Sequence, residues 1–352
     1  MGKQFLDQSV SQPTGGKRIA WIDFVRGLII ILMVFGHNIQ YGSGDTMLAN
    51  KLFLNNKVFQ FIYSFHMPCL MILSGYLFEH TVTKQGFWRN RFRTIIIPTL
   101  CWSVIPVAGL VAGHVLSHTF SLHSFIDAFA TLLAYYWFLW ALLFCSAIVW
   151  LVHTMLKDSI LCYCLIGVIL MFVPLKYNLY QWIYMYPYFV LGYLYKKKPF
   201  KKWKNWNRHL ITVSLIGAFA LLFAFYHSDF FIYTTGITVR SMRQLFIDLY
   251  RYIIGFAGSV MIIWLVYQLY PYIESKAPAV SKTVVYCGRV SLTIYIVDVL
   301  LNSYVLPQIT KGFTLNYGIT IIETLAVLLF CTAVDWGIRR FPVTRRILLG
   351  SR

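Results

Sequence analysis

The chain has 352 residues, of which 59% are hydrophobic and only 12% are charged, and its formal net charge is +19. Soluble domains are roughly half apolar and a quarter charged, so this composition excludes an ordinary soluble enzyme. The basic residues stand in short runs between apolar segments, which is typical of topology signals in a membrane protein. This distribution of the basic residues argues against nucleic acid as a partner.

The N-terminal residues 1–17 are polar and have no apolar core, so we expect them to form a disordered cytoplasmic tail. The following apolar segment, 20–41, is longer than the core of a signal peptide and lacks a small-residue cleavage pattern. We expect it to remain as the first membrane helix. One transmembrane domain would then occupy 18–340, followed by a cytoplasmic tail over 341–352.

Apolar runs of about 20 residues can cross a bilayer as helices, and the predicted fold is an all-α polytopic integral membrane protein with about ten transmembrane helices. The predicted spans are 20–41, 58–79, 93–113, 134–155, 159–175, 178–195, 210–227, 248–270, 286–305 and 317–338. Basic clusters after the second and sixth spans belong in the cytoplasm, and an even number of spans places both termini there. The lipid bilayer is the expected partner, and a bacterial cytoplasmic (inner) membrane the expected location.

The seven cysteines lie in or beside apolar stretches and lack the spacing of metal ligands. Buried thiols are therefore the preferred interpretation, and no metal site is predicted.

The first span carries Asp23, Arg26 and His37, although ionisable groups inside a membrane cost a few kcal/mol. Asp23 and Arg26 are neighbours on a helix, and His37 lies about three turns beyond Arg26 on the same face. This face would join the inner and outer leaflets. The alternative is a structural ion pair with an interfacial histidine.

Three further ionisable residues, His66, Asp298 and Glu323, fall in the outer half of the predicted bundle. A shared polar cavity would stabilise them. For His66 a packing role beside Pro68 and a catalytic role both stay open, whereas Asp298 and Glu323 are interpreted as structural.

Two other groups have competing interpretations. Arg89, Arg91 and Arg93 precede the third span and satisfy the topology rule, but guanidinium groups also suit the phosphates of a nucleotide cofactor.

The aromatic rings that begin the fourth span would stack on sugars or form an interfacial belt, and the belt is preferred. They are Tyr135, Tyr136, Trp137 and Trp140.

Several stretches together resemble the acyltransferase family 3 membrane transacylases, in the branch with fucose 4-O-acetylase-like proteins. RIAWIDFVRGLIIILMVFGH is similar to the family's opening helix with its R-x10-H spacing, and FIYSFHMPCLMILSGYLF to its second helix. FWRNRFRTIIIPTLCW, YYWFLWAL, YPYFVLGYLYKKK and CGRVSLTIYIVD are similar to later landmarks. Two departures are Thr94, where relatives often carry a basic residue, and Asp298, where many carry histidine.

The resemblance implies an O-acyltransferase that moves an acyl group, most simply acetyl, from cytoplasmic acyl-CoA to a hydroxyl of an envelope carbohydrate or glycolipid. His37 would be the general base, because an imidazole accepts a proton at neutral pH. Arg26, held by Asp23, would stabilise negative charge or fix the donor, and His66 would assist or bind sugar. Arg89, Arg91 and Arg93 would hold the CoA phosphates, and Arg26 would also bind the donor.

Other interpretations stay open at this point. A transporter or flippase for an envelope glycan or lipid-linked sugar would also carry intramembrane charges, although no inverted repeat is evident. A lipid-modifying membrane O-acyltransferase would use an intramembrane histidine without the opening R-x10-H spacing. The acceptor, the acyl group, a covalent intermediate on a residue such as Ser74 and a homodimer are all left undecided.

Overall fold

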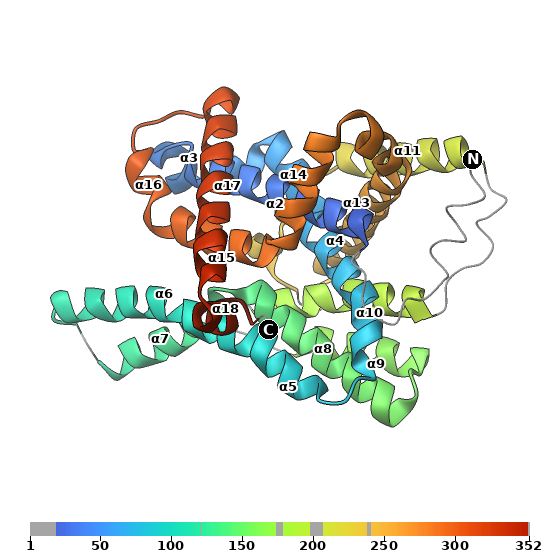
Figure 1. The fold of residues 1–352 in the computed structure, drawn as a ribbon, viewed down its shortest axis with the longest axis horizontal. Helices are drawn as coiled ribbons and strands as arrows, with labels where there is room; N and C mark the ends of the chain where they lie inside the picture. The colour runs from blue at the N-terminus through green and yellow to red at the C-terminus, as the bar shows by residue number, and fades with distance from the viewer. Residues whose placement is uncertain (1–18, 120, 174–178, 198–206, 238–240, 351–352) are drawn as a thin grey trace.

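The computed structural model describes residues 19–119, 121–173, 179–197, 207–237 and 241–350, and every regular element within these ranges is helical (Figure 1). The predicted N-terminal tail lies outside the described residues. The first half contains α2 (Ala20–Tyr41), α3 (Asp45–Ala49), η1 (Leu52–Asn55), α4 (Lys57–Val82), α5 (Phe87–Arg91), η2 (Phe92–Ile96), α6 (Ile97–Leu116), α7 (Leu122–Ala134) and α8 (Trp137–Leu156). The second half contains α9 (Ile160–Met171), α10 (Tyr180–Lys197), α11 (Arg208–Ala224), η4 (Ser228–Phe230), α12 (Ile232–Thr235), α13 (Met242–Lys276), α14 (Pro278–Arg289), α15 (Ser291–Tyr304), α16 (Leu306–Ile309), α17 (Tyr317–Arg340) and α18 (Pro342–Leu349).

Each of the ten predicted spans has a helical counterpart. Six helical stretches in the described part of the chain are long and apolar enough to cross a membrane: α2, α4, α5 to α6, α8, α13 and α17. The bent pair α14–α15 makes a seventh, and α9 and α11 are shorter apolar helices. The chain is therefore an all-α polytopic membrane protein, while the number ten stays a prediction.

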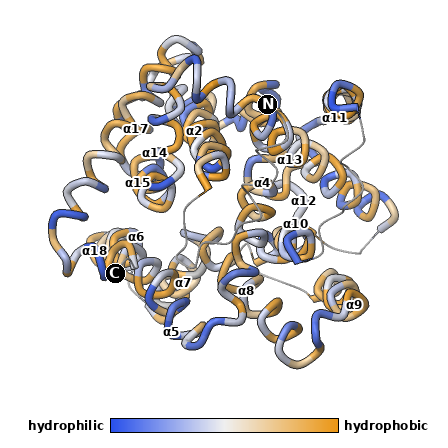
Figure 2. The backbone as a smooth tube through the Cα atoms, turned by 45° about the vertical axis from the view of Figure 1, so that its right-hand side comes forward, coloured by the Kyte–Doolittle hydropathy of each residue, from blue (hydrophilic) through white to orange (hydrophobic). Residues whose placement is uncertain are grey.

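The apolar composition is distributed as a bilayer requires. Figure 2 shows hydrophobic colouring along most of the helical length, with hydrophilic stretches at helix ends and links. Large apolar side chains such as Val104, Leu221 and Leu329 are exposed on the outside of the bundle. Exposure of such a surface to water would cost free energy, whereas lipid tails solvate apolar side chains. The helices also satisfy their own backbone hydrogen bonds, as a membrane interior requires.

The ninth predicted span is not one straight helix. α14 and α15 meet at Val290 with a bend of 75°, so the prediction of a continuous helix over 286–305 is wrong. Both helices pack against α2. The break lies between Arg289 and Ser291, a polar point inside a segment that was otherwise read as one span.

Close helix crossings form the centre of the bundle. α4 packs along α10, and a Cβ atom on Gly75 would overlap the backbone of Phe189, while one on Gly192 would overlap that of Ile72. Small residues at such a crossing let two backbones touch, which is a common basis of helix association in membranes. α4 begins at Asn56, whose side chain accepts hydrogen bonds from the first free backbone N–H groups.

The link between the third and fourth predicted spans contains α7. α6 and α7 lie side by side and form an arm that reaches away from the rest of the bundle (Figure 1). At the other end of the chain, α18 packs on α6, and the indole of Trp102 donates a hydrogen bond to the carbonyl of Leu348 at 3.0 Å.

A polar cluster joins the ends of α8, α9 and α10 around Asp158. Its carboxylate accepts hydrogen bonds from Tyr163 (2.8 Å) and Tyr193 (3.0 Å), lies 2.7 Å from the ring of His153, and pairs with Lys197. Burial raises the pKa of Asp158, but these partners outweigh it and lower the pKa to about 2. The cluster places three predicted cytoplasmic helix ends together.

Candidate active site

The site is built along α2, where the sequence predicted one functional face. At its start α2 crosses α14 so closely that a Cβ atom on Gly27 would overlap the carbonyl of Val284, and one on Gly288 would overlap that of Asp23. Any larger residue at these two positions would force the helices apart. The crossing therefore determines which residues of the ninth span meet the first.

An ionic group surrounds this crossing. The buried carboxylate of Asp23 lies 4.0 Å from the guanidinium of Arg26 and 3.5 Å from that of Arg289. Arg26 also donates a hydrogen bond of 3.1 Å to the hydroxyl of Ser291. The predicted neighbourhood of Asp23 and Arg26 is present, and Arg289 adds a second cation that the sequence analysis did not assign to the site.

Three turns further along α2, the ring of His37 meets a carboxylate. Its Nδ1 lies 2.5 Å from Oδ2 of Asp298, a fully buried residue of α15. The second oxygen of Asp298 accepts a hydrogen bond of 2.8 Å from the amide of Asn302. Asp298, which the sequence analysis interpreted as structural, is therefore in direct contact with the predicted base.

This contact has a chemical consequence for His37. A carboxylate accepts the proton on Nδ1, which leaves Nε2 as the ring nitrogen with a free lone pair. A histidine oriented in this way acts as a general base, because the carboxylate stabilises the imidazolium that forms when a proton is taken up. The side chain of His37 keeps 17% of its surface accessible.

The second predicted histidine lies beside the first through a shared tyrosine. Tyr63 of α4 has its ring centre 6.3 Å from that of His37 and 4.6 Å from that of His66. His66 is buried and donates its Nδ1 proton to the carbonyl of Ile62 at 3.0 Å. Its Nε2 makes no hydrogen bond to the described residues, and His66 lines a small pocket. The packing contact is observed, and a catalytic role for His66 stays a prediction.

The predicted donor-binding arginines are not equivalent. Arg91 is half-buried, donates a hydrogen bond of 3.1 Å to Thr81, and lies over the rings of Phe78 and Phe87. Arg89 and Arg93 are exposed. The structure therefore commits Arg91 to the packing of α4 on α5, whereas its two neighbours present their guanidinium groups to solvent.

The aromatic residues at the start of α8 also differ from one another in their surroundings. Tyr136 is fully buried, with its ring 6.2 Å from that of Tyr295, so its assignment to an interfacial belt is wrong. Trp137 lines the same pocket as His66. Glu323 lies beside Gly42 at the end of α2.

One charged pair was missed altogether. Asp248 and Arg251 of α13 are buried and form an ion pair of 2.8 Å, and Arg251 lines the pocket beside His66. An acidic and a basic residue three positions apart inside an apolar segment were a detectable signal. In the part of the chain that the structure describes, no three His, Cys, Asp or Glu side chains are grouped to hold a metal ion.

Comparison with known proteins identifies the family of this chain. The profile of the acyltransferase 3 family, described as an acyltransferase domain, matches residues 19–340. The chain is 31% identical over 234 residues to the Nodulation protein NolL of Sinorhizobium fredii (strain NBRC 101917 / NGR234), covering 63% of this chain and 61% of that protein. It is 23% identical over 343 residues to the Nodulation protein NolL of Mesorhizobium japonicum (strain LMG 29417 / CECT 9101 / MAFF 303099), covering 94% and 89%. No solved structure gives a significant match.

Proposed function

Because the chain belongs to the acyltransferase 3 family, we propose that it transfers an acyl group, in the simplest case acetyl, from cytoplasmic acyl-CoA to a hydroxyl of an envelope carbohydrate on the outer face. The observation that carries this proposal is the pair of His37 and Asp298 at 2.5 Å. It provides an oriented base inside a membrane bundle. The protein would lie in a bacterial cytoplasmic membrane with both termini inside.

In this mechanism Nε2 of His37 takes the proton of the acceptor hydroxyl as the hydroxyl oxygen bonds to the acyl carbon. The carbon–sulfur bond of the thioester breaks, and His37 passes the proton to the departing sulfur, so the products are the ester and free CoA. Asp298 stabilises the charged imidazolium between these two steps. A direct transfer of this kind needs no covalent enzyme intermediate.

The length of α2 assigns a different task to Arg26. Eleven residues of helix rise by about 16 Å, which exceeds the reach of an arginine side chain, so Arg26 and His37 do not act on the same carbonyl oxygen. Arg26, beside Asp23 and Arg289, instead suits the donor, whose extended pantetheine arm runs from the inner end of α2 toward His37. The exposed Arg89 and Arg93 suit the CoA phosphates.

The experiment that tests this proposal uses the purified full-length protein in nanodiscs with radiolabelled acetyl-CoA. We expect specific binding and slow hydrolysis of the thioester, followed by transfer once a carbohydrate acceptor is added. In the His37→Ala variant we expect retained binding and turnover reduced by about 10²- to 10⁴-fold. Retained turnover would remove His37 as the base. If the wild type ignores acetyl-CoA and succinyl-CoA alike, the acyltransferase proposal fails and glycan transport becomes the function to test.

A further inference from the structure

One carboxylate near the end of the bundle that the predicted topology places outside has no partner among the described residues. Both carboxylate oxygens of Glu323 in α17 are buried, and neither accepts a hydrogen bond from any residue in the described ranges. No lysine, arginine or histidine of those ranges pairs with it. An unpaired charge in a low-dielectric interior is strongly unfavourable, so buried charges are normally paired or bound to a metal ion.

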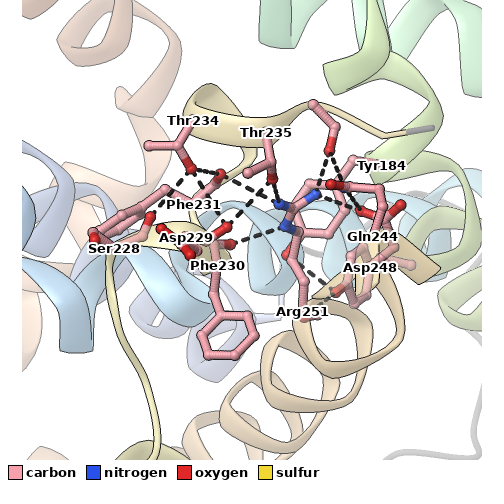
Figure 3. A network of polar contacts seen from close by, with 12 residues as sticks. Tyr184, Ser228, Asp229, Phe230, Phe231, Thr234, Thr235, Gln244, Asp248 and Arg251 are labelled. Atoms are coloured by element: carbon pink, nitrogen blue, oxygen red, sulfur yellow. Dashed lines mark hydrogen bonds and ion pairs between the residues drawn. The ribbon is translucent and has the colours of Figure 1, made fainter. Parts of the chain in front are cut away.

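Elsewhere the same bundle satisfies a buried charge completely, as Figure 3 shows for Arg251. A guanidinium has five N–H donors. Arg251 gives them to the carbonyls of Phe230 (2.8 Å), Gly236 (2.7 Å) and Phe231 (3.3 Å), to the hydroxyl of Thr235 (2.6 Å) and to its ion-pair partner Asp248 (2.8 Å). The bare oxygens of Glu323 differ from this pattern, and such a group in a folded protein calls for a bound water or ion.

A second oxygen acceptor comes from α2, which packs against α17. Asn38 is 0% exposed, and its Nδ2 donates a hydrogen bond of 3.0 Å to the hydroxyl of Thr324. The amide cannot be turned over, because Thr324 gives its one hydroxyl proton to the carbonyl of Thr320 at 2.7 Å and can therefore only accept from Asn38. Oδ1 of Asn38 thus stays an acceptor, and no described residue donates a hydrogen bond to it.

The carboxylate meets α2 at the point where that helix ends. A Cβ atom on Gly42, the residue after α2, would lie 2.5 Å from Oε2 of Glu323 and 2.9 Å from the carbonyl oxygen of Asn38. The last carbonyl groups of a helix give its C-terminus a partial negative charge, and α2 has no basic residue in its last turn. An anion is repelled at this position, whereas a cation is attracted by the helix end and by the carboxylate together.

The composition of this contact favours an alkali-metal ion over a proton. Oε1 and Oε2 of Glu323 and Oδ1 of Asn38 are all acceptors, and hard cations bind such oxygens. A single proton on the carboxyl group would link at most two of these oxygens. One carboxylate and one neutral amide carry one negative charge, which a monovalent ion balances. A divalent ion would leave an excess positive charge in the interior.

We propose that Glu323 and Asn38 bind a monovalent metal cation, sodium or potassium, at the contact between the end of α2 and the start of α17. The ion would hold together two helices of the bundle one turn beyond His37. Helix ends and carboxylates form sodium sites of this kind inside other membrane proteins. The proposal is independent of the acyltransferase function, and it adds a site where the sequence analysis predicted no metal.

The first test measures binding of radiolabelled sodium, and of radiolabelled rubidium as a substitute for potassium, to the purified full-length protein in detergent. Choline chloride keeps the ionic strength constant. We expect saturable binding of about one ion per chain, with Ca²⁺ and Mg²⁺ competing at least about tenfold more weakly than Na⁺ or K⁺.

Two variants locate the site. Glu323→Gln keeps the shape of the side chain but removes its charge, so the affinity for the ion should fall by at least about tenfold. The matched control is Glu274→Gln, which changes an exposed glutamate of α13 and should leave ion binding as in the wild type.

Thermal unfolding gives a second measurement that needs no variant. An ion that binds only the folded state stabilises it, so sodium or potassium chloride at ten times the Kd should raise the Tm of the wild type by about 3 °C over choline chloride. Glu323→Gln should show no such rise. In choline chloride it should be at least as stable as the wild type, because the unbalanced charge is gone.

Several results would overturn the proposal. They are the absence of saturable sodium and rubidium binding to the wild type, unchanged binding in Glu323→Gln, and equal stabilisation by choline. Tighter binding of Ca²⁺ than of either alkali ion would overturn the monovalent assignment. If neither ion binds and raising the pH destabilises the wild type but not Glu323→Gln, the carboxyl group carries a proton instead, and the cation site is wrong.

Discussion

Two pairs of ionisable residues in this bundle, Asp248 with Arg251 and His37 with Asp298, are built in opposite ways. In the pair of Asp248 and Arg251, both side chains are almost completely buried, at 0% and 3% exposed, and every donor of the arginine is used. In the pair of His37 and Asp298, the carboxylate is equally buried, but 17% of the histidine side chain is exposed and its Nε2 makes no hydrogen bond to any residue that the structure describes.

The difference shows two ways in which a membrane protein uses a buried ionisable side chain, whose burial costs free energy. In a closed pair, such as Asp248 with Arg251, every donor is bonded, so the pair holds segments together and has no atom left for a substrate. In an open pair, such as His37 with Asp298, one bond orients the ring and one ring nitrogen stays available. Burial alone therefore does not identify a catalytic charge. The proposed base differs from the closed pair in the hydrogen-bonding capacity that it retains.

The largest effect is expected from breaking the closed pair. Asp248→Ala leaves the buried guanidinium of Arg251 without its counter-ion, which should destabilise the protein by about 3–5 kcal/mol. Thermal unfolding in detergent measures this loss. The control is Asp229→Ala, whose exposed pair with Arg243 should contribute less than about 1 kcal/mol. Equal losses in both variants would contradict the distinction drawn above.

The open pair should respond in activity. Asp298→Asn removes the charge that orients and supports the imidazole of His37, and we expect turnover to fall by about 10- to 100-fold, with the unfolding temperature nearly unchanged. In a His37→Ala background the same change should have little further effect, because its target is gone. An equal loss of turnover with and without His37 would assign Asp298 to packing.

A smaller effect separates the three arginines at the predicted inner end. The double variant Arg89→Gln and Arg93→Gln should weaken CoA binding by about tenfold, because phosphate loses two exposed guanidinium partners. Arg91→Gln should instead lower thermal stability, since it loses the bond to Thr81 and its stacking on two phenylalanine rings. Titration calorimetry measures the affinity of each variant for CoA. Weakened CoA binding in Arg91→Gln at unchanged thermal stability would assign Arg91 to the donor site and contradict its role in packing.

The smallest effect concerns acid stability. Asp158 has its pKa lowered from 3.8 to about 2 in the folded protein, so between these values the unfolded chain binds more protons. Its contribution of about 2 kcal/mol is complete above pH 4 and is lost as the pH falls toward 2. Chemical unfolding at pH 5 and pH 3 should show a shallower loss in Asp158→Asn than in the wild type. Parallel losses would contradict the role of this carboxylate.

Most of the membrane helices were predictable because membrane insertion depends on the apolar composition of each segment. Long apolar runs predicted the helices, and the spacing of Asp23, Arg26 and His37 predicted a single face of α2, since helical periodicity needs no knowledge of the partners. The family resemblance predicted the chemistry. His66 could be placed on its helix, but its combined packing and pocket-lining role could not be distinguished in advance.

What lay beyond prediction depends on contacts between distant segments. His37 and Asp298 are 261 positions apart, and they meet because α14 bends into α15 at Val290 and crosses α2 at two glycines. Arg251 is satisfied mainly by backbone carbonyls, which every residue carries and which leave no pattern in a sequence. Local periodicity determines which helices form and which residues share a face, but the choice of partner across a helix interface is made by packing of the whole bundle.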